Sequence, residues 1–298
     1  MKAQEFTIKE LESFSGVKAH TIRIWEQRYG LLAPDRTDTN IRRYNDKDLK
    51  KLLNISLLNS LGYKISAISK MSDADMTDEI AKHNAVNPGE AHRLNSLKVS
   101  MLNYDEMLFD EIVDGHIEKY GLELTFKDVL LPFLNEIGLL WQTDAICPAH
   151  EHFISNLVRT KLLHHVSLVK PKSSDGSERT FVLFLPDLEI HELSLIMINY
   201  MLRVSGFRTI FLGISVPADD LKQIYNRIGS VEFISIFTTH PPMVLLNDYL
   251  KKLAMDFEDT PCHFHLSGYL LKGVKSPDSR TLSIYPDLGK LLESIRNN

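Results

Sequence analysis

Short apolar runs alternate with helical stretches throughout the last part of the chain, and this pattern constrains the fold more than any other feature of the sequence. The apolar runs are residues 180–185, 207–212, 231–237, 262–266 and 281–285. The helical stretches are residues 191–205, 217–228, 242–256 and 286–296. Apolar runs of this length predict buried strands, and strands that alternate with helices form a parallel sheet covered on both faces. We therefore expect a doubly wound, Rossmann-like α/β domain over residues 178–298.

The middle of the chain shows helical periodicity almost without interruption. It predicts four helices, over residues 92–102, 104–120, 126–141 and 148–168. Helices of these lengths pack most simply as a four-helix bundle, which we place at residues 92–169. Pro132 lies within the third helix and predicts a kink or a displaced boundary there. The polar residues 73–91, with Pro88-Gly89, predict a connector with about one helical turn.

The first 72 residues predict a helix-turn-helix module. Thr7 and Glu10 have the spacing of a capping box, which starts a short helix. Gly16-Val17 forms a tight turn before a second helix over residues 18–27. Further helices are expected from Asp46 onward and over residues 64–71. The whole chain is therefore expected to be a multi-domain protein of the α plus α/β class.

The charge of the chain is divided unevenly between this module and the rest. Residues 1–70 hold 13 Lys and Arg against 8 Asp and Glu, although the net charge of the whole chain is −5. A positive module on an acidic body is typical of a protein that binds a polyanion through one end only. The two cysteines make no disulfide framework, and we find neither a membrane-spanning run nor a signal peptide. These features predict a cytoplasmic protein.

The second helix of the module carries a cationic surface suited to DNA. The residues expected to share its exposed side are Lys18, His20, Arg23 and Gln27, whereas Ile22 and Trp25 face inward. Arg23 is best placed for a guanine, because its planar fork can donate to two acceptors at once. The residues expected at phosphates are Lys18, Arg28, Arg36, Arg42 and Arg43, with Tyr29 and Tyr44 against the DNA backbone. The alternative is a solvated helix face beside a small aromatic core.

These residues resemble the MerR family of transcription regulators. The matching segments are Thr7-Ile8-Lys9-Glu10-Leu11, Gly16-Val17, Thr21-Ile22-Arg23, Gly30-Leu31-Leu32, Pro34-Asp35-Arg36 and Arg42-Arg43-Tyr44. One further segment, Ile24-Trp25-Glu26-Gln27-Arg28-Tyr29-Gly30, resembles the subgroup of this family whose members carry large sensor domains. The resemblance implies a winged helix-turn-helix with its wing at residues 35–43, which binds a two-fold site in double-stranded promoter DNA as a dimer. Family members that sense metals use cysteines after a long helix, and none lies there in this chain.

A histidine and a glutamate stand where the predicted sheet would bind a ligand. Glu189 and His191 both follow the strand 180–185, and Glu189 stands two residues before His191. Open α/β sheets bind ligands at the carboxyl ends of their strands, and a carboxylate can orient a histidine that ligates a metal. The alternative reading of His191 is a hydrogen-bonded surface histidine, which is the more common state of a single histidine in a loop.

The surrounding pattern resembles the cobalamin-binding domain of methionine synthase and related proteins. It comprises Glu189-x-His191-x-x-Ser194, Ser235-x-Phe237 and Ser267-Gly268. The resemblance implies that His191 ligates cobalt from below, and that small residues line a slot for the displaced base of the cofactor. The family has glycine at the position of Ser194, Gly-Gly at 267–268 and a compact residue at Phe237. Because the ring of Phe237 is large, we expect it to narrow the slot.

The predicted bundle carries a second set of matching residues. Trp141 is followed ten residues later by Glu151-His152. This spacing resembles the light-sensing, adenosylcobalamin-dependent repressors of carotenoid genes, where Trp covers the upper face of the corrin and the Glu-His pair lies beside the adenosyl group. The family has a histidine directly after the Trp, where this chain has Gln142. Without the resemblance, Trp141 reads as a core aromatic and Glu151 as an acidic residue at a helix N-terminus.

The leading hypothesis is a DNA-binding regulator, dimeric or of higher order, that possesses no enzymatic activity and senses adenosylcobalamin or a related corrinoid, with light as a further candidate signal. The alternative is a ligand-independent regulator whose degenerate cobalamin-like half serves only for oligomerisation or partner binding. A corrinoid methyltransferase module is a third hypothesis. It would need a catalytic partner domain and would have no use for the cationic residues 18–44.

Overall fold

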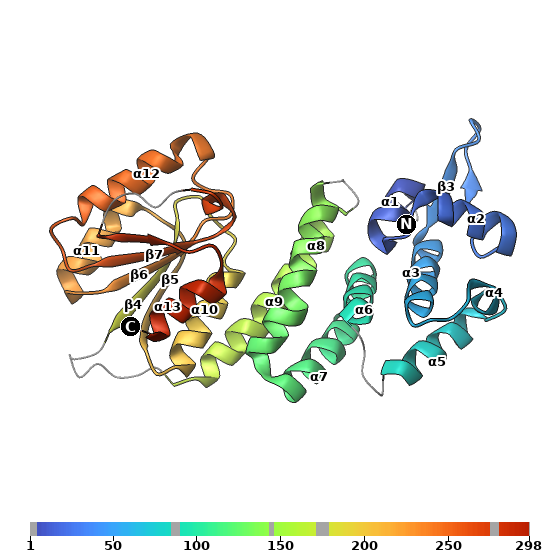
Figure 1. Cartoon of the computed structure of the whole chain (residues 1–298), viewed down its shortest axis with the longest axis horizontal. Helices are drawn as coiled ribbons and strands as arrows, with labels where there is room; N and C mark the ends of the chain where they lie inside the picture. The colour runs from blue at the N-terminus through green and yellow to red at the C-terminus, as the bar shows by residue number, and fades with distance from the viewer. Residues whose placement is uncertain (1–4, 85–89, 143–145, 171–178, 275–279, 298) are drawn as a thin grey trace. The chain divides into compact units, whose positions relative to one another are not determined.

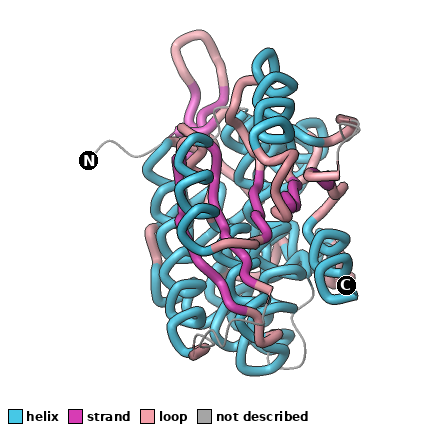
Figure 2. The backbone as a smooth tube through the Cα atoms, turned by 90° about the vertical axis from the view of Figure 1, so that its left-hand side faces the viewer, coloured by secondary structure: helices cyan, strands magenta, loops and turns pink. Residues whose placement is uncertain are grey.

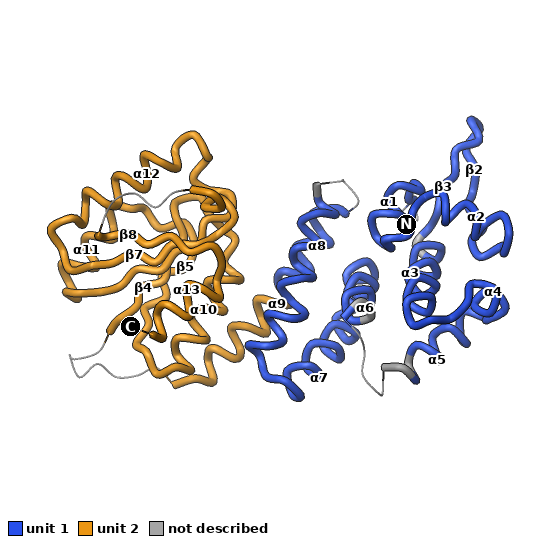
Figure 3. Tube along the Cα trace, viewed as in Figure 1, with its two compact units in different colours: residues 1–157 blue, residues 158–298 orange. Residues whose placement is uncertain are grey.

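The computed structural model describes residues 5–84, 90–142, 146–170, 179–274 and 280–297. The chain divides into two compact units, residues 1–157 and residues 158–298, shown in two colours in Figure 3. The boundary falls inside one helix, α9 (Pro148–Leu168), so that helix contributes residues to both units. No helix among the described residues combines the length and the hydrophobicity that crossing a bilayer requires.

Unit 1 begins with a winged helix-turn-helix, as predicted (Figure 1). Its helices are α1 (Ile8–Ser15), α2 (Ala19–Tyr29), α3 (Asp46–Ser60) and α4 (Ile65–Ile68). Its strands β1 (Glu5–Phe6), β2 (Asp35–Arg36) and β3 (Arg42–Asn45) form an antiparallel sheet in the order β1-β3-β2. Strands β2 and β3 are the wing. The predicted capping box and the predicted tight turn are both present. Thr7 and Glu10 form the capping box, and Gly16 ends α1 with a left-handed φ of 70°.

The prediction of a connector with about one helical turn at residues 73–91 is wrong for its first part, because residues Asp73–Asn84 form a helix of about three turns, α5. Ser72 and Asp75 exchange side-chain and backbone hydrogen bonds that cap the start of this helix. Met76 and Ile80 lie one turn apart and are both buried, which gives α5 an apolar side. The polar composition of the segment concealed this short apolar pattern. Pro88-Gly89 lies outside the described residues.

The helical segment of unit 1 agrees with the four predicted helices, with one irregularity. The helices are α6 (Glu90–Asn103), α7 (Glu106–Thr125), α8 (Leu131–Gln142) and α9, and a π-helical turn η1 (Phe126–Leu130) joins α7 to α8. Helix α7 is longer than the expected 104–120, and Gly121 within it has a non-helical φ of 80°. Pro132 lies in the first turn of α8, directly after the π-helical turn, so the predicted irregularity is present there.

Unit 2 contains the parallel sheet that the alternating pattern predicted. Its strands are β4 (Thr180–Pro186), β5 (Arg208–Val216), β6 (Glu232–Ile236), β7 (His263–Ser267) and β8 (Leu282–Ile284). They are all parallel and lie in the order β5-β4-β6-β7-β8. Figure 2 shows the strands in magenta between cyan helices. The order reverses at β4, and the carboxyl ends of strands on either side of such a reversal form a binding crevice.

Helices cover both faces of this sheet. The helices are α10 (Leu193–Val204), α11 (Ala218–Ile228), α12 (Met243–Asp256) and α13 (Leu288–Asn297), with a short 3-10 turn η2 (Tyr269–Leu271). Leucines of α11 and α12 pack on one face of the sheet, and apolar residues of α10 and α13 pack on the other. This arrangement buries every residue of β4 and confirms the doubly wound architecture.

Candidate functional sites

The exposed side of α2 carries three of the residues predicted to contact DNA. His20, Arg23 and Arg28 are exposed, whereas Ile22 and Trp25 are buried against the rest of the module. Lys18 is exposed directly before α2, and its ammonium group pairs with Glu12 at 3.0 Å. Tyr29 is half-buried, with the Arg28 guanidinium 5.5 Å from the centre of its ring. Cations therefore surround the face of α2 that points away from the core.

Glu26 joins the wing to α2, and sequence reasoning missed this role. The Nε atom of Arg42 donates to both Glu26 carboxylate oxygens, at 3.1 and 2.9 Å, and Arg36 approaches the same carboxylate at 3.8 Å. The hydrogen bond to Glu26 raises the pKa of Arg42. A carboxylate in a cationic helix would repel DNA, so its presence was a signal that it has a cation partner within the protein.

Tyr44 does not lie where the predicted contact with DNA would need it. Its side chain is fully buried, because Tyr44 pairs with Phe6 across strands β3 and β1 and points into the core. Its hydroxyl donates to Glu26 at 3.2 Å. Burial, together with the charge of Glu26, raises the pKa of Tyr44 to about 12. Tyr44 thus supports the wing from inside the module, and Arg43 beside it stays partly exposed.

His191 lies in the loop between β4 and α10, at the carboxyl end of the sheet, as predicted. Its side chain is 50% exposed, and its Nδ1 atom lies 2.5 Å from the Glu189 carboxylate. A carboxylate at this distance keeps the proton on Nδ1, so Nε2 is the nitrogen that can ligate a metal. The two residues therefore form the orienting pair that their spacing suggested.

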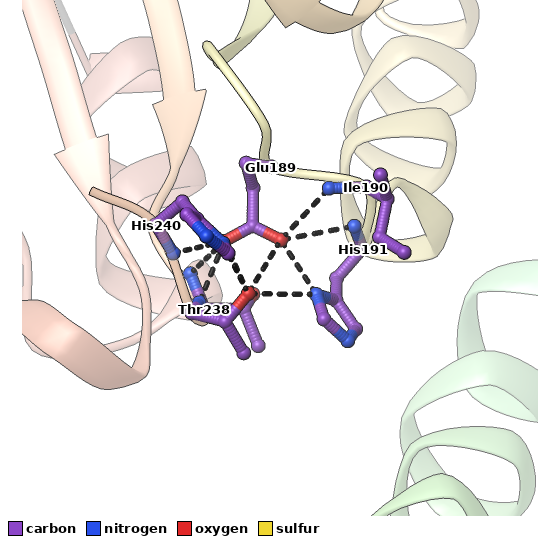
Figure 4. A network of polar contacts seen from close by, with 6 residues as sticks. Glu189, Ile190, His191, Thr238 and His240 are labelled. Atoms are coloured by element: carbon purple, nitrogen blue, oxygen red, sulfur yellow. Dashed lines mark hydrogen bonds and ion pairs between the residues drawn. The ribbon is translucent and has the colours of Figure 1, made fainter. Parts of the chain in front are cut away.

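Glu189 is held by two loops at once (Figure 4). One carboxylate oxygen accepts hydrogen bonds from the backbone N–H groups of Ile190 and His191, at 3.0 and 3.1 Å. The other accepts from the backbone N–H groups of Thr238, Thr239 and His240, at 3.0, 2.6 and 2.9 Å. Burial alone would raise the pKa of this carboxyl, but these donors and His191 outweigh burial and hold the pKa well below its ordinary value. Glu189 therefore stays ionised although its side chain is fully buried.

The loop 238–240 is the part of this site that sequence reasoning missed. Thr239 also places its hydroxyl 3.3 Å from the Glu189 carboxylate and 3.4 Å from Nδ1 of His191. The loop follows β6, and β6 pairs with β4, so the residues after these two strands meet at one edge of the sheet. Polar residues directly after a buried strand were the available signal.

The predicted small residues lie near the ends of the inner strands. Ser194 is half-buried in the first turn of α10, and Ser235 is buried in β6. Ser267 is buried at the end of β7, where its hydroxyl donates to the Tyr285 carbonyl at 3.1 Å. Gly268 has a φ of 129°, and a Cβ atom there would lie 2.3 Å from the carbonyl oxygen of Phe237. Close packing of the backbone therefore requires glycine at position 268.

Phe237 belongs to the hydrophobic core. Its ring is fully buried and packs against Tyr249 of α12, with ring centroids 5.8 Å apart. The hydroxyl of Ser235 is buried, and no hydrogen-bond partner for it lies among the described residues. Glu189 and His191 have the chemistry of a metal-ligating histidine oriented by a carboxylate, and the ring of Phe237 lies in the core two residues after Ser235.

The bundle residues Trp141, Glu151 and His152 lie in unit 1. Trp141 is near the end of α8 and 46% exposed. Glu151 and His152 are in the first turn of α9, where the Glu151 carboxylate pairs with Nδ1 of His152 at 2.7 Å and accepts a hydrogen bond from Ser155. The structure thus brings the predicted Glu-His pair together. The side chain of Gln142 lies outside the described residues.

Comparisons with known proteins match two successive segments of the chain to separate family models. A family model described as "MerR HTH family regulatory protein" matches residues 6–75. A second family model, described as "B12 binding domain", matches residues 93–164, which hold the bundle helices and the Trp141, Glu151 and His152 set.

Two curated proteins and one solved structure extend the likeness across both units. The HTH-type transcriptional repressor CarH of Myxococcus xanthus is 30% identical over 267 residues, which cover 87% of this chain and 84% of that protein. The repressor CarA of the same organism is 24% identical over 257 residues, 83% of each chain. The structure of the Methanosarcina barkeri monomethylamine corrinoid protein covers 70% of this chain and 99% of its own, with a TM-score of 0.54. At 12% identity, that likeness shows the fold alone.

Proposed function

The chain belongs to the family of MerR-type helix-turn-helix transcription regulators that carry a B12-binding domain, and on that premise we propose that adenosylcobalamin or a related corrinoid is its signal. The corrinoid would favour one conformation or oligomer of the regulator, and DNA affinity would follow that shift. We propose a homodimer or a higher homo-oligomer that works in the cytoplasm on double-stranded promoter DNA.

The observation that carries this proposal is the Glu189–His191 pair. The buried carboxylate orients the His191 ring and holds the proton at Nδ1, at the edge of the sheet where this fold binds ligands. A bound corrinoid would supply a cobalt ion that can accept a nitrogen ligand, and Nε2 of His191 is the atom that we assign to hold it. Thr239 and the backbone N–H groups of the loop 238–240 keep Glu189 in place for this role.

The remaining predicted residues have supporting positions in this proposal. Resemblance assigns Trp141, Glu151 and His152 to the upper face of the corrinoid, and the B12-binding family model covers all three. The small residues Ser194, Ser235, Ser267 and Gly268 are assigned to its nucleotide tail. Gln142 stands where light-sensing repressors have a second histidine, so we propose that the cofactor itself is the signal rather than light.

On DNA, we assign sequence reading to Arg23 and His20 of α2. Lys18, Arg28, Tyr29, Arg36 and Arg43 are assigned to the DNA backbone. Arg42 acts mainly through Glu26, because its guanidinium is engaged by that carboxylate. The division of the chain into residues 1–72, 92–169 and 178–298 remains our proposal for its functional modules.

Titration of the purified protein with adenosylcobalamin in the dark, followed by gel filtration, tests this function. We expect the protein fraction to keep the absorbance of the cofactor, with the spectral shift of histidine ligation. His191→Ala should lose that shift, whereas His164→Ala, which removes an exposed histidine of α9, should keep it. A colourless protein fraction from the wild type would overturn the proposal.

The buried ring of Phe237 favours a second candidate, a regulator that senses no ligand. If the ring keeps the nucleotide tail out, unit 2 would serve only for oligomerisation or partner binding. Phe237→Ala separates the two candidates. Tighter retention of cobalamin by this variant than by the wild type would show that the slot exists and that the ring narrows it.

A further inference from the structure

We propose that Lys98 is a positioning residue that couples the helical bundle to the DNA-binding module. Lys98 lies on α6, within the segment that matches the B12-binding family model, and is only 6% exposed. Its ammonium group donates to the carbonyl oxygen of Phe14 in α1 at 3.1 Å, and it pairs with the carboxylate of Glu136 in α8 at 2.7 Å. One buried cation thus contacts both modules of unit 1.

The Phe14 contact stabilises the end of the first helix of the helix-turn-helix. The last carbonyl groups of a helix have no partner within it and attract cations. In α1, the carbonyl of Ser15 accepts a hydrogen bond at 3.1 Å from Ser56, a residue of the DNA-binding module itself. The neighbouring carbonyl of Phe14 instead takes its donor from the bundle, so the bundle contributes to the position of the turn before α2.

The contact is part of a wider interface between the two modules. Helix α6 packs against α3, where Leu49 and Leu53 face Val99 and Leu102 across one narrow gap. Lys98 is adjacent in sequence to Val99, so one turn of α6 contacts α3 through Val99 and α1 through Lys98. Apolar packing holds the helices together without fixing their register, whereas a buried ammonium requires specific oxygen partners.

Glu136 connects this interface to the helix that bears Trp141. Both residues belong to α8, and Trp141 is the residue assigned above to the corrinoid. A shift of α8 would move Glu136, and Lys98 would have to follow it or remain buried with one partner fewer, which is costly. Since Lys98 also holds Phe14, the shift would reach α1. This transmission rests on the proposed corrinoid function, whereas the contact between the modules does not.

The contact itself is tested without any cofactor, by hydrogen exchange on the full-length protein. Lys98→Met removes the charge and keeps the apolar stem, so amides of both α1 and α6 should exchange faster. Ser56→Ala is the matched control, because it removes a hydrogen bond to the next carbonyl of α1 from inside the DNA-binding module, and it should affect α1 but not α6. Lys98→Arg keeps a cation and should restore most of the protection.

The coupling is tested by measuring the Kd for promoter DNA with and without adenosylcobalamin. In the wild type, adenosylcobalamin should change the Kd for DNA by a certain factor, the coupling ratio. We expect this coupling ratio to be about fivefold or more smaller in Lys98→Met and in Glu136→Gln, because fivefold is the lower range of allosteric coupling. The ratio should be unchanged in Ser56→Ala and largely recovered in Lys98→Arg. A purely structural role would instead weaken DNA binding equally in both states.

If Lys98→Met kept the wild-type ratio of the two Kd values for DNA, Lys98 would have no role in coupling. The same conclusion would follow if Ser56→Ala lowered this ratio as much as Lys98→Met does. Unchanged exchange in α6 of Lys98→Met would overturn the contact between the modules. If the wild type retains no cobalamin on gel filtration, the proposed function fails on that result, and the exchange data still decide the contact.

Discussion

Glu189 shows how one buried side chain can hold a histidine and two loops in the positions that the proposed ligand site needs. Its carboxylate accepts hydrogen bonds from backbone groups of two loops and from His191, and these compensate for the loss of water around the charge. The charge is held in place by main-chain donors, so the His191 ring does not have to reorganise when a metal binds. The orientation of one histidine therefore depends on a neighbour that the corrinoid is not expected to touch.

We predict that Glu189→Gln weakens cobalamin binding by about 10- to 100-fold, the usual cost of losing an orienting partner behind a metal ligand. The amide cannot accept from all the backbone donors and no longer favours the proton on Nδ1. Absorbance titration of the full-length protein measures this affinity. Asp187→Asn is the matched control, since it removes an exposed carboxylate two residues earlier. Equal affinities for the two variants would contradict the prediction.

At the scale of elements, close packing at the carboxyl end of the sheet depends on one glycine. Gly268 follows β7 and starts η2, and its α-carbon approaches the backbone of Phe237 after β6. The amide of Phe237 donates to the Ser267 carbonyl at 2.9 Å, which draws the two strand ends together. The close approach of Gly268 to the backbone of Phe237 is thus a consequence of strand pairing.

We predict that Gly268→Ala destabilises the protein by about 3 kcal/mol or more, because the new methyl group would overlap the Phe237 carbonyl and force the backbone to move. Gly273→Ala is the matched control. Its φ is also positive, at 78°, but nothing lies within 4 Å of the added atom, so it should cost only about 1–2 kcal/mol. Chemical denaturation gives both values, and similar losses would contradict this account of the packing.

A partly buried polar network joins the other end of the sheet to the last helix. Arg179 donates to the Glu232 carboxylate, at 2.5 and 2.8 Å, and to the carbonyl of Ile295 in α13 at 2.9 Å. Glu232 also pairs with His265 at 2.7 Å. Burial alone would raise the pKa of Glu232, but Arg179 and His265 outweigh it and lower the pKa to about 2. The network therefore attaches α13 to the sheet by charge as well as by apolar packing.

We predict that Glu232 stabilises the fold above pH 4.5, its ordinary pKa, and that this contribution is lost as the pH falls toward 2. The sign follows from the lowered pKa of the folded state, since the unfolded chain then binds the proton more tightly. The contribution is about 3 kcal/mol. Unfolding by denaturant between pH 2 and 6 should show a weaker acid dependence in Glu232→Gln than in the wild type. Asp219→Asn, which breaks an exposed pair with Lys252, serves as the comparison.

At the scale of the whole molecule, the division of charge favours DNA binding through one end. Residues 1–70 carry more cations than anions, 13 against 8, while the net charge of the chain is −5. DNA repels an acidic body and attracts a cationic module, so the charge pattern orients the protein on DNA before any base is read.

We predict different consequences for two cations of this module. Arg23→Ala should relax sequence preference at one base pair and cost about 1–3 kcal/mol on the specific site. Lys18→Ala should weaken binding to all sequences alike and lower the slope of log affinity against log salt by about 1. Fluorescence anisotropy on specific and scrambled DNA over a range of salt measures both effects. If Lys18→Ala changed the sequence preference and Arg23→Ala changed only the salt slope, our assignment of Arg23 to a base and of Lys18 to a phosphate would be reversed.

The amino-acid sequence by itself determined most of the secondary structure, the cap of the first helix and the local side-chain pairs of this protein. Alternating apolar runs predicted the five strands of the sheet in unit 2. The Thr7–Glu10 cap and the Glu189–His191 pair were predictable because their partners lie two or three residues apart. Helix α5 was missed because its apolar side consists of few residues in a polar segment.

Only the tertiary structure decided which distant segments meet. Strand order brings the loop 238–240 to Glu189, about 50 residues away, and helix packing brings Lys98 to Phe14, 84 residues away. The burial of Tyr44 likewise follows from the register of β3 against β1, and the pairing of Arg42 with Glu26 follows from the packing of β3 beside α2. Local patterns set the period and the ends of elements, whereas contacts over such separations depend on how complete elements pack, and no short stretch of sequence records that packing.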